Sequence, residues 1–193
     1  MNHPLSNVTA IDAGGNQGIF PGFVCASMTS SGEKCWGSNW YGELGIGTST
    51  GPTICQSGKP CSTSPLDVCA VGAASPCDGS SGHGILSNVA GLAAAGQHTC
   101  AVITGGTMDC WGWNIYFQIG HGTQDPANVT IPVQVCVASC GSPLTGITNA
   151  AGGYASGGYG QTCALKDAGE NPLAYGVVCW GWNIDGQLGD NTT

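Results

Sequence analysis

The chain has 193 residues, including 34 glycines and 12 cysteines, and a formal net charge of −8. This charge argues against a nucleic-acid partner, because phosphate binding needs a basic surface. The glycine content disfavours long helices, whereas 41% hydrophobic residues suffice for a core. The even number of locally spaced cysteines indicates an oxidising compartment, which is extracellular or at the cell surface. The sequence has no apolar window of ~18 residues, so we expect no membrane span.

Three repeats are expected to organise the chain. Taken in order, each begins with a proline-led strand, continues with a small-residue strand ending in glycine and a hairpin bounded by cysteines, and ends with the sequence Cys-Trp-Gly. The proline-led strands are expected at 4–8, 65–68 and 132–135, and Cys-Trp-Gly starts at Cys35, Cys110 and Cys179. We expect one repeat array over 1–193, with units at approximately 1–50, 65–123 and 132–193. Cysteine-rich connecting loops are expected at 51–88 and 124–146.

The hairpins predict disulfides. In 100–110, two four-residue flanks surround a Thr-Gly-Gly turn, which places Cys100 opposite Cys110 at a separation that a disulfide can span. The first repeat has the same spacing, and the third has a longer turn between its cysteines. Repeat equivalence supports two of the remaining pairs, and one follows from the cysteines left over. The predicted disulfides are Cys25–Cys35, Cys55–Cys61, Cys69–Cys77, Cys100–Cys110, Cys136–Cys140 and Cys163–Cys179.

The repeated motif resembles the regulator of chromosome condensation repeat. The resemblance is carried by Gly96-Gln-His-Thr-Cys-Ala-Val102 with Cys110-Trp-Gly-Trp-Asn114, and by their counterparts at 161–165 and 179–190. It is similar to the cysteine-containing version found in secreted bacterial proteins. The resemblance implies an all-β fold of β-propeller type, with three disulfide-stapled blades of antiparallel strands. The nuclear founder of the family lacks this cysteine pattern, so its nucleotide-exchange activity is not expected here.

Three blades are too few for a closed ring, since propellers typically have 4–8. The chain stops after Leu188 and Thr193, where a proline-led strand would follow, and it starts with such a strand at Pro4, Leu5 and Val8. We therefore expect the start of one copy to complete the last blade of another, head-to-tail, in a ring or a filament. The function predicted is structural and self-assembling. The alternatives are a secreted propeller that binds carbohydrate or protein, and a segment of a longer propeller.

Few other sites are expected. The repeated Trp36, Trp111 and Trp180 are predicted to be core, whereas Trp40, Trp113 and Trp182 are candidates for stacking on a glycan. Glycosylation sequons start at Asn7, Asn128 and Asn191. The acids are scattered and no nucleophile motif occurs, so we expect neither an enzyme nor catalytic residues. No resident metal or cofactor is expected, and calcium near Asp185 and Asp190 is the weak alternative.

Overall fold

A computed structural model describes residues 5–16, 20–29, 32–55, 58–123, 128–137, 140–154, 159–167 and 175–193, and its regular elements there are β-strands. These are β1 (Val8–Asn16), β2 (Phe20–Met28), β3 (Gly32–Ser38), β4 (Thr53–Ile54), β5 (Pro60–Asp67), β6 (Val89–Ala94), β7 (His98–Ile103), β8 (Thr107–Gly112), β9 (Val129–Gln134), β10 (Cys136–Val137), β11 (Ser142–Pro143), β12 (Ile147–Tyr154), β13 (Gly160–Asp167) and β14 (Tyr175–Gly181). Over these residues the chain forms no helix long and apolar enough to cross a membrane.

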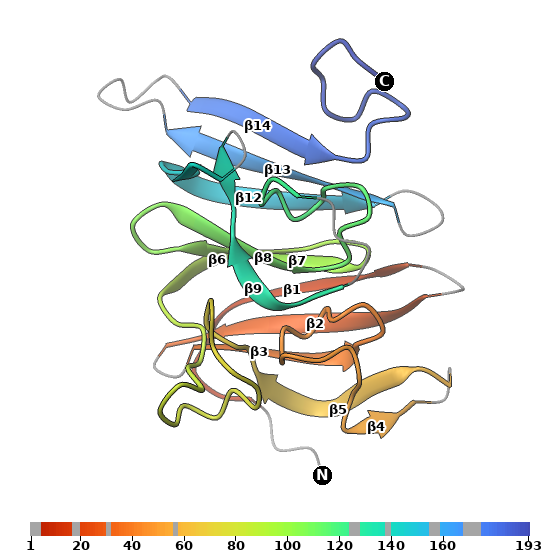
Figure 1. Cartoon of the computed structure of the whole chain (residues 1–193), viewed down its shortest axis with the longest axis vertical. Helices are drawn as coiled ribbons and strands as arrows, with labels where there is room; N and C mark the ends of the chain where they lie inside the picture. Colours follow the sequence, from red (N-terminus) through yellow and green to blue (C-terminus); the bar gives the residue numbers. More distant parts are fainter. Residues whose placement is uncertain are drawn as a thin grey trace.

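Three antiparallel sheets lie one above the other along the long axis of the molecule (Figure 1). Blade 1 has the strand order β1-β2-β3-β5-β4, blade 2 has β6-β7-β8-β9, and blade 3 has β12-β13-β14. β10 and β11 form a separate pair. The inner strand β6 contacts both β1 and β12, the inner strands of the neighbouring blades. This is the arrangement of successive blades in a β-propeller, the fold that the family resemblance implies.

The glycine of Cys-Trp-Gly has a steric role in each blade. Gly37, Gly112 and Gly181 have φ angles of 103°, 107° and 108°. A Cβ atom at Gly112 would lie 2.7 Å from the Cα atom of His98 on the paired strand. The register between β8 and β9 also shifts between Cys110 and Gly112. Glycine therefore permits a bulge at the end of the third strand, where the chain leaves the sheet.

The proline-led strands close blades and do not open them. Pro65 lies in β5, which pairs with β3 of blade 1, and Pro132 lies in β9, which pairs with β8 of blade 2. The units 1–50, 65–123 and 132–193 therefore assign these strands to the wrong blades. The stretches 51–88 and 124–146 also contain strands as well as loops. The pairing of β5 and β9 with an earlier strand, across a long loop, is the physical reason for this difference.

The N-terminal segment also differs from the prediction. Val8 begins β1, and Asn7, at φ 61°, accepts a hydrogen bond on its carbonyl from Thr29 N at 2.8 Å. Asn88, at φ 60°, accepts one from Thr104 N at 2.7 Å in the same way. Leu5 to Val8 thus correspond to the lead-in of an inner strand, and the proposal that they form a spare fourth strand is wrong. Pro4 lies outside the described residues.

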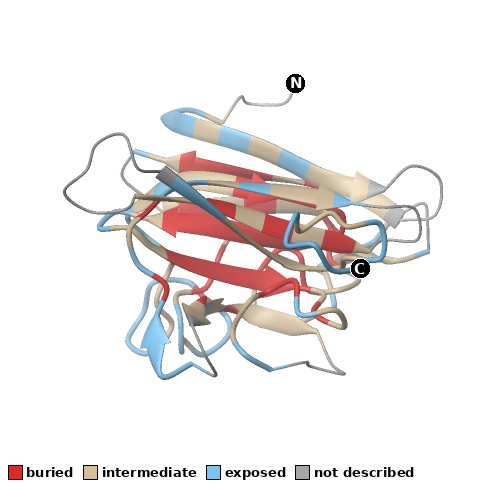
Figure 2. Ribbon diagram, turned by 90° about the horizontal axis from the view of Figure 1, so that it is seen from above, coloured by how far each residue is buried: buried red, intermediate tan, exposed pale blue. Residues whose placement is uncertain are grey.

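The cysteines are joined in the six predicted pairs, Cys25–Cys35, Cys55–Cys61, Cys69–Cys77, Cys100–Cys110, Cys136–Cys140 and Cys163–Cys179. The three hairpin bridges have Cα separations of 4.1 Å, as expected for directly opposed residues. Buried residues concentrate on the strands inside the stack, whereas the loops at its rim are more exposed (Figure 2). The core therefore lies between blades.

Candidate functional site

Each blade has two chemically different faces. The disulfide face carries the hairpin disulfide, and the tryptophan face carries Trp36, Trp111 or Trp180 according to the blade. The disulfide face of blade 1 packs against the tryptophan face of blade 2, where Cys25, Cys35, Ala101 and Trp111 share one buried cluster. The disulfide face of blade 2 packs in the same way on blade 3. We call these contacts the first and the second junction.

The loop after Cys-Trp-Gly is folded by one asparagine. In blade 1 the Asn39 side chain accepts a hydrogen bond from Leu44 N at 3.1 Å and donates to Thr48 O at 2.9 Å. Glu43 Oε2, in turn, accepts a hydrogen bond from Tyr41 N at 2.8 Å. The same bonds recur in blades 2 and 3, with the counterparts Asn114, Gln118, Asn183 and Gln187. These side chains fix the loop and so orient the carbonyl of its Glu or Gln residue.

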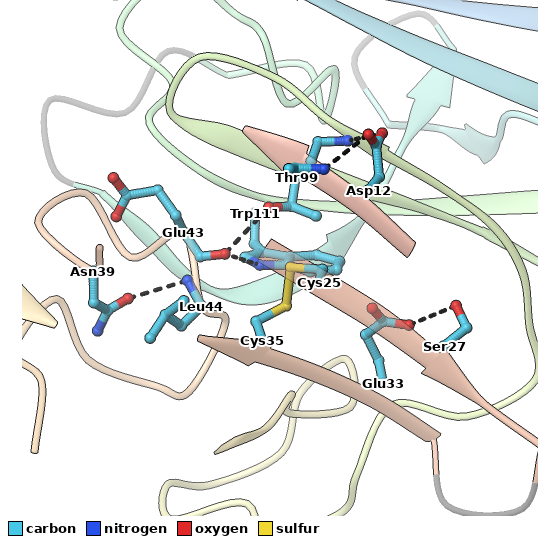
Figure 3. Close-up of a disulfide and its surroundings, with 12 residues drawn as sticks. Asp12, Cys25, Ser27, Glu33, Cys35, Asn39, Glu43, Leu44, Thr99 and Trp111 are labelled. Carbon is cyan, nitrogen blue, oxygen red and sulfur yellow. Dashed lines mark hydrogen bonds between the residues drawn. A yellow bond between two sulfur atoms is a disulfide. The ribbon is translucent and has the colours of Figure 1, made fainter. Parts of the chain in front are cut away.

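That carbonyl is the polar centre of each junction. Glu43 O accepts hydrogen bonds from Trp111 Nε1 at 2.7 Å and from Thr99 Oγ1 at 3.1 Å, both on blade 2 (Figure 3). At the second junction, Gln118 O accepts them from Trp180 Nε1 and Thr162 Oγ1, each at 2.9 Å. A buried indole N–H needs such a partner, so this bond fixes how one blade sits on the next.

An aromatic pair closes each junction at its rim. Tyr41 of blade 1 lies 5.2 Å from Trp113 of blade 2, measured between ring centroids. The equivalent pair of the second junction is Tyr116 and Trp182, at 4.4 Å. Tyr159 stacks on Trp182, also at 4.4 Å, and extends the cluster. The half-buried rings form a strip over all three blades, and such pairs add about 0.5–1.5 kcal/mol each beyond their burial.

The three tryptophans considered for glycan stacking all lie in this strip. Trp40 has Tyr41 stacked at 5.2 Å, and the Lys59 ammonium group lies 3.3 Å from the centroid of its indole ring. Trp113 and Trp182 both stack on Tyr159, with interplanar angles of 20° and 15°. Much of the area of these ring faces is therefore directed at other side chains. The strip therefore favours a structural role for these tryptophans over stacking on a glycan.

Three buried carboxyl groups lie on the faces of the first junction. Burial raises the pKa of Glu33 to about 8, against the opposing effect of a 2.8 Å hydrogen bond from Ser27 Oγ. Burial raises the pKa of Glu43 to about 7 and that of Asp109 to about 6. Their counterparts at the second junction, aligned by strand pairing and loop position, are Met108, Gln118 and Val178.

The second junction contains a buried histidine instead. His98 Nε2 lies 2.7 Å from Thr162 Oγ1, which itself donates a hydrogen bond to Gln118 O. The imidazole must therefore donate through Nε2 in this network. Burial lowers the pKa of His98 to about 4, so the ring is neutral at physiological pH. Phe23 occupies the same position in blade 1, opposite the Cys-Trp-Gly glycine.

Both ends of the stack present a half-junction. On blade 3 the disulfide face is open: Val177 is 68% exposed, and Ala151, Cys163 and Leu165 contribute to a surface hollow of about 190 Å³. On blade 1 the tryptophan face carries Ile11, 65% exposed, and the half-buried Val24 and Trp36. The equivalent positions of blade 2 on these two faces are buried or partly buried against a neighbouring blade.

The remaining predicted residues stay apart from the junctions. Asn7 and Asn191 are exposed, whereas Asn128 is half-buried and donates from Nδ2 to Trp40 O at 3.2 Å. Thr193 is exposed, and Leu188 N is held by the loop asparagine of blade 3. Asp190 Oδ1 accepts hydrogen bonds from Thr192 within its own turn, which lowers its pKa, and Asp185 is exposed nearby.

Within the described ranges, one group of side chains with potential metal-ligating atoms lies close together: Cys25, Glu33 and Cys35. Its two sulfur atoms are joined in a disulfide, so they cannot act as thiolate ligands. The junction carbonyls and the Tyr–Trp pairs were not predicted from the sequence. One signal could have revealed the carbonyls: Glu43, Gln118 and Gln187 each stand eight positions after a Cys-Trp-Gly cysteine.

No family model matches the sequence. A curated relative is the ultraviolet-B receptor UVR8 of Arabidopsis thaliana, which is 28% identical over 165 residues, or 85% of this chain and 28% of the receptor. The chain thus spans under a third of the length of this relative.

Solved structures show the same fold. One is Prp20p from Saccharomyces cerevisiae, whose structure was described with its binding properties to Gsp1p and histones. The match covers 97% of this chain and 36% of the Prp20p chain, with a TM-score of 0.61 and 16% identity. Yeast RCC1 (Prp20) bound to Kap60 matches 92% of this chain and 32% of its own, with a TM-score of 0.56 and 16% identity. Human WBSCR16 matches 92% and 33%, with a TM-score of 0.58 and 19% identity.

Proposed function

This chain is an RCC1-like repeat protein, and we propose that it is an extracellular structural module that assembles head-to-tail through its two end faces. In this assembly the disulfide face of blade 3 packs on the tryptophan face of blade 1 in a second copy. Six disulfides support the oxidising compartment. Successive copies form a ring if the rotation between them closes and a filament if it does not.

One observation carries this proposal: the open faces are the two halves of a junction that the chain itself forms twice. Val177 corresponds to Met108, which is fully buried at the second junction. Trp36 corresponds to Trp111, whose indole N–H bonds to Glu43 O. In the assembly, Trp36 Nε1 donates to Gln187 O of the second copy. Exposed apolar residues such as Val177 and Ile11 on these two faces are consistent with an interaction site.

The ends also lack two contacts that the internal junctions have. Val24 occupies the position of Thr99 and Thr162, which donate a hydrogen bond to the loop carbonyl, and valine has no donor. Asp185 occupies the position of the tyrosines in the two aromatic pairs, Tyr41 and Tyr116. A contact between copies is therefore weaker than an internal junction.

The test is the concentration dependence of mass for the oxidised chain, measured by sedimentation equilibrium. We expect reversible association that Val177→Lys weakens at least tenfold, because a charge enters the apolar contact. Val71→Lys is the matched control, since Val71 is 50% exposed and lies in the loop between β5 and β6. A monomer at all concentrations, or equal effects of both variants, would refute the proposal.

A gain-of-contact variant sharpens the test. Val24→Thr restores the hydroxyl donor of the internal junctions at nearly constant side-chain volume, and we expect tighter association of about threefold to tenfold. Val24→Ala removes apolar area at the same place and should weaken the association.

If this chain is a segment of a longer protein, the same faces are covered by further blades in cis. Val177→Lys in that longer protein would then lower the free energy of unfolding and leave association unchanged.

A further inference from the structure

A hollow of about 400 Å³ lies at the outer edge of blade 1. Its three walls are the loop 46–52 after β3, Leu66 and Asp67 of β5, and the segment 75–78 in the loop before β6. Its volume is within the range of ligand sites, roughly 300–1,000 Å³. The lining includes none of the residues named above for the aromatic strip, the junction carbonyls or the two open end faces. The hollow is therefore separate from the sites described above.

The hollow does not depend on what covers the open face of blade 1. Asp67 pairs with Lys34 on β3, and its counterpart in blade 2 is Gln134, which pairs with Asp109 on β8. Gln134 is exposed although blade 2 has a neighbouring blade on each side. This position on an outer strand is therefore open to solvent even where both junctions of the blade are formed.

The third wall is longer in blade 1 than in blade 2. The disulfide Cys69–Cys77 joins this wall to the chain just after β5 and spans eight residues, whereas its counterpart in blade 2 spans four. The longer loop reaches the first wall, where Ser75 Oγ donates a hydrogen bond to Ile46 O at 3.0 Å. The insertion in this loop thus builds a wall that blade 2 does not have over its described residues.

Hydrogen bonds and close packing hold the first wall in place. Asn39 Nδ2 donates to Thr48 O at 2.9 Å and to Thr50 O at 2.6 Å. Gly47 approaches the third wall so closely that a Cβ atom there would lie 2.4 Å from the Cβ atom of Ser75. The hollow is formed by fixed segments, so little conformational entropy of the protein is lost when a ligand enters.

The floor of the hollow is apolar and its rim is exposed. Ile46 and Leu66 are half-buried and pack against the core of the first junction, and Cys77 is 8% exposed. Thr50 and Pro52 lie at the exposed rim. A ligand that fits this arrangement has an apolar part that enters the hollow and a larger part that stays at its mouth.

The charged residues in the lining are both acidic, Asp67 and Asp78. Lys34 Nζ lies 2.5 Å from Asp67 Oδ1 and balances that charge. Hydrogen bonds from the side chain and backbone of Ser80 lower the pKa of Asp78, so this carboxylate is ionised at neutral pH. The net negative charge of the hollow therefore comes from Asp78, and it is complementary to a cation.

We propose that this hollow binds an arginine side chain of a partner polypeptide. The carbon stem lies along Ile46 and Leu66, and the guanidinium group pairs with the Asp78 carboxylate. Arginine suits such a contact because its guanidinium group is more weakly hydrated than an ammonium group. The partner's main chain contacts the rim at Thr50 and Pro52. This chain contains no arginine, so the partner is a different protein and not a second copy.

The test titrates the full oxidised, isotope-labelled chain with the peptide acetyl-Gly-Arg-Gly-amide and follows the backbone amide shifts by NMR. We expect saturable shifts confined to 46–52, 66–67 and 75–78. The matched peptide contains citrulline, which has a similar shape and no charge, and it should bind about fivefold to tenfold more weakly. Propylguanidinium, which is the side chain alone, should bind about threefold more weakly because it makes no contact with the rim.

Variants of the chain locate the charge. Asp78→Asn should weaken the binding of the arginine peptide by about fivefold and leave that of the citrulline peptide unchanged. Asp185→Asn is the matched control, because it changes the net charge equally in the exposed loop after β14, and its effect should be less than about twofold. Val177→Lys should also leave peptide affinity within about twofold while it weakens association, which separates this site from the head-to-tail contact.

Four results would overturn the proposal. They are the absence of saturable shifts with the arginine peptide, equal binding of the citrulline peptide, and equal effects of Asp78→Asn and Asp185→Asn. The fourth is equal binding of propylguanidinium, because the hollow would then be a site for a small free cation. None of these results alters the association expected of the wild-type chain, so the two proposals fail independently.

Discussion

The two junctions of this molecule share one geometry but differ in their buried chemistry. Both place a Glu or Gln carbonyl under a tryptophan and a threonine of the next blade. The first junction buries Glu33, Glu43 and Asp109, whereas the second has apolar or amide side chains at those positions and buries His98. Backbone and aromatic contacts thus define the junction, and the remaining positions can vary in charge. Because of this difference, we expect the two halves of the stack to respond oppositely to pH.

The signs follow from the pKa directions. Glu33 and Glu43 have folded pKa values raised above the unfolded value, so their contribution to stability is full below about pH 4.5 and declines as pH rises through about 7 to 8. His98 has a lowered pKa, so its contribution is full above about pH 6.5 and declines as pH falls toward 4. The first junction is therefore weakened by base and the second by acid.

The largest effect is expected for Glu33→Gln. The amide keeps the hydrogen bond with Ser27 but removes the buried charge that forms above about pH 8. We expect the free energy of unfolding at pH 9 to rise by roughly 3–5 kcal/mol over wild type, with little change at pH 5. Urea unfolding of the oxidised protein at both pH values measures this. Met108→Glu is the reciprocal variant and should confer alkaline sensitivity on the second junction; parallel pH profiles would contradict the comparison.

Glu43→Gln is expected to have the next largest effect. Gln118 and Gln187 already occupy this position in the other blades, and their Oε1 atoms accept the same backbone hydrogen bond. Neutralising Glu43 should stabilise the protein by roughly 3 kcal/mol at pH 9 and much less at pH 5. Gln118→Glu should move the same dependence to blade 2. If Glu43→Gln instead destabilised the protein at both pH values, the carboxylate would have a role that the amide cannot fill.

His98→Gln tests the acid side of the comparison. Gln161 occupies the same position in blade 3, so glutamine is compatible with the strand. Wild type should lose roughly 2–3 kcal/mol between pH 6.5 and pH 4 through this group, and the variant should not show that loss. His83→Gln is the control, because His83 lies in the 68–88 loop, away from both junctions. A variant that retains the full acid sensitivity would place its origin elsewhere.

Local spacing was enough to predict the disulfides, because the hairpin cysteines face each other across turns of a few residues. Non-local pairing was not predictable in the same way. The assignment of Pro65 and Pro132 to new units was wrong because β5 and β9 pair with strands that precede them by a whole loop. The segment from Leu5 to Val8 was wrongly predicted to be a strand of the same kind, since it too follows a proline and begins with an apolar residue.

The junctions show the same limit. The tryptophans of Cys-Trp-Gly were predicted to be core, and Trp111 is indeed fully buried. Their hydrogen-bond acceptors lie on the preceding blade, however, and no sequence spacing connects Trp111 with Glu43. Trp113 and Trp182 were considered for ligand stacking because an isolated aromatic residue in a loop has no visible partner. Their tyrosine neighbours lie on the adjacent blade, so the sequence alone does not identify them.

The smallest effect concerns the aromatic pair, which both junctions share and which should not depend on pH. Tyr41→Leu removes the ring between Trp40 and Trp113, and we expect a loss of about 0.5–1.5 kcal/mol in the free energy of unfolding. The loss should be equal at pH 5 and pH 7, since it arises from ring contacts and not from charge. Tyr154→Leu is the matched control, because Tyr154 lies at the end of β12 and is 47% exposed. Comparison with Trp113→Leu and the double variant isolates the pair energy. A coupling energy near zero would mean that the rim contact is incidental and that the carbonyl–tryptophan bond alone orients the blades.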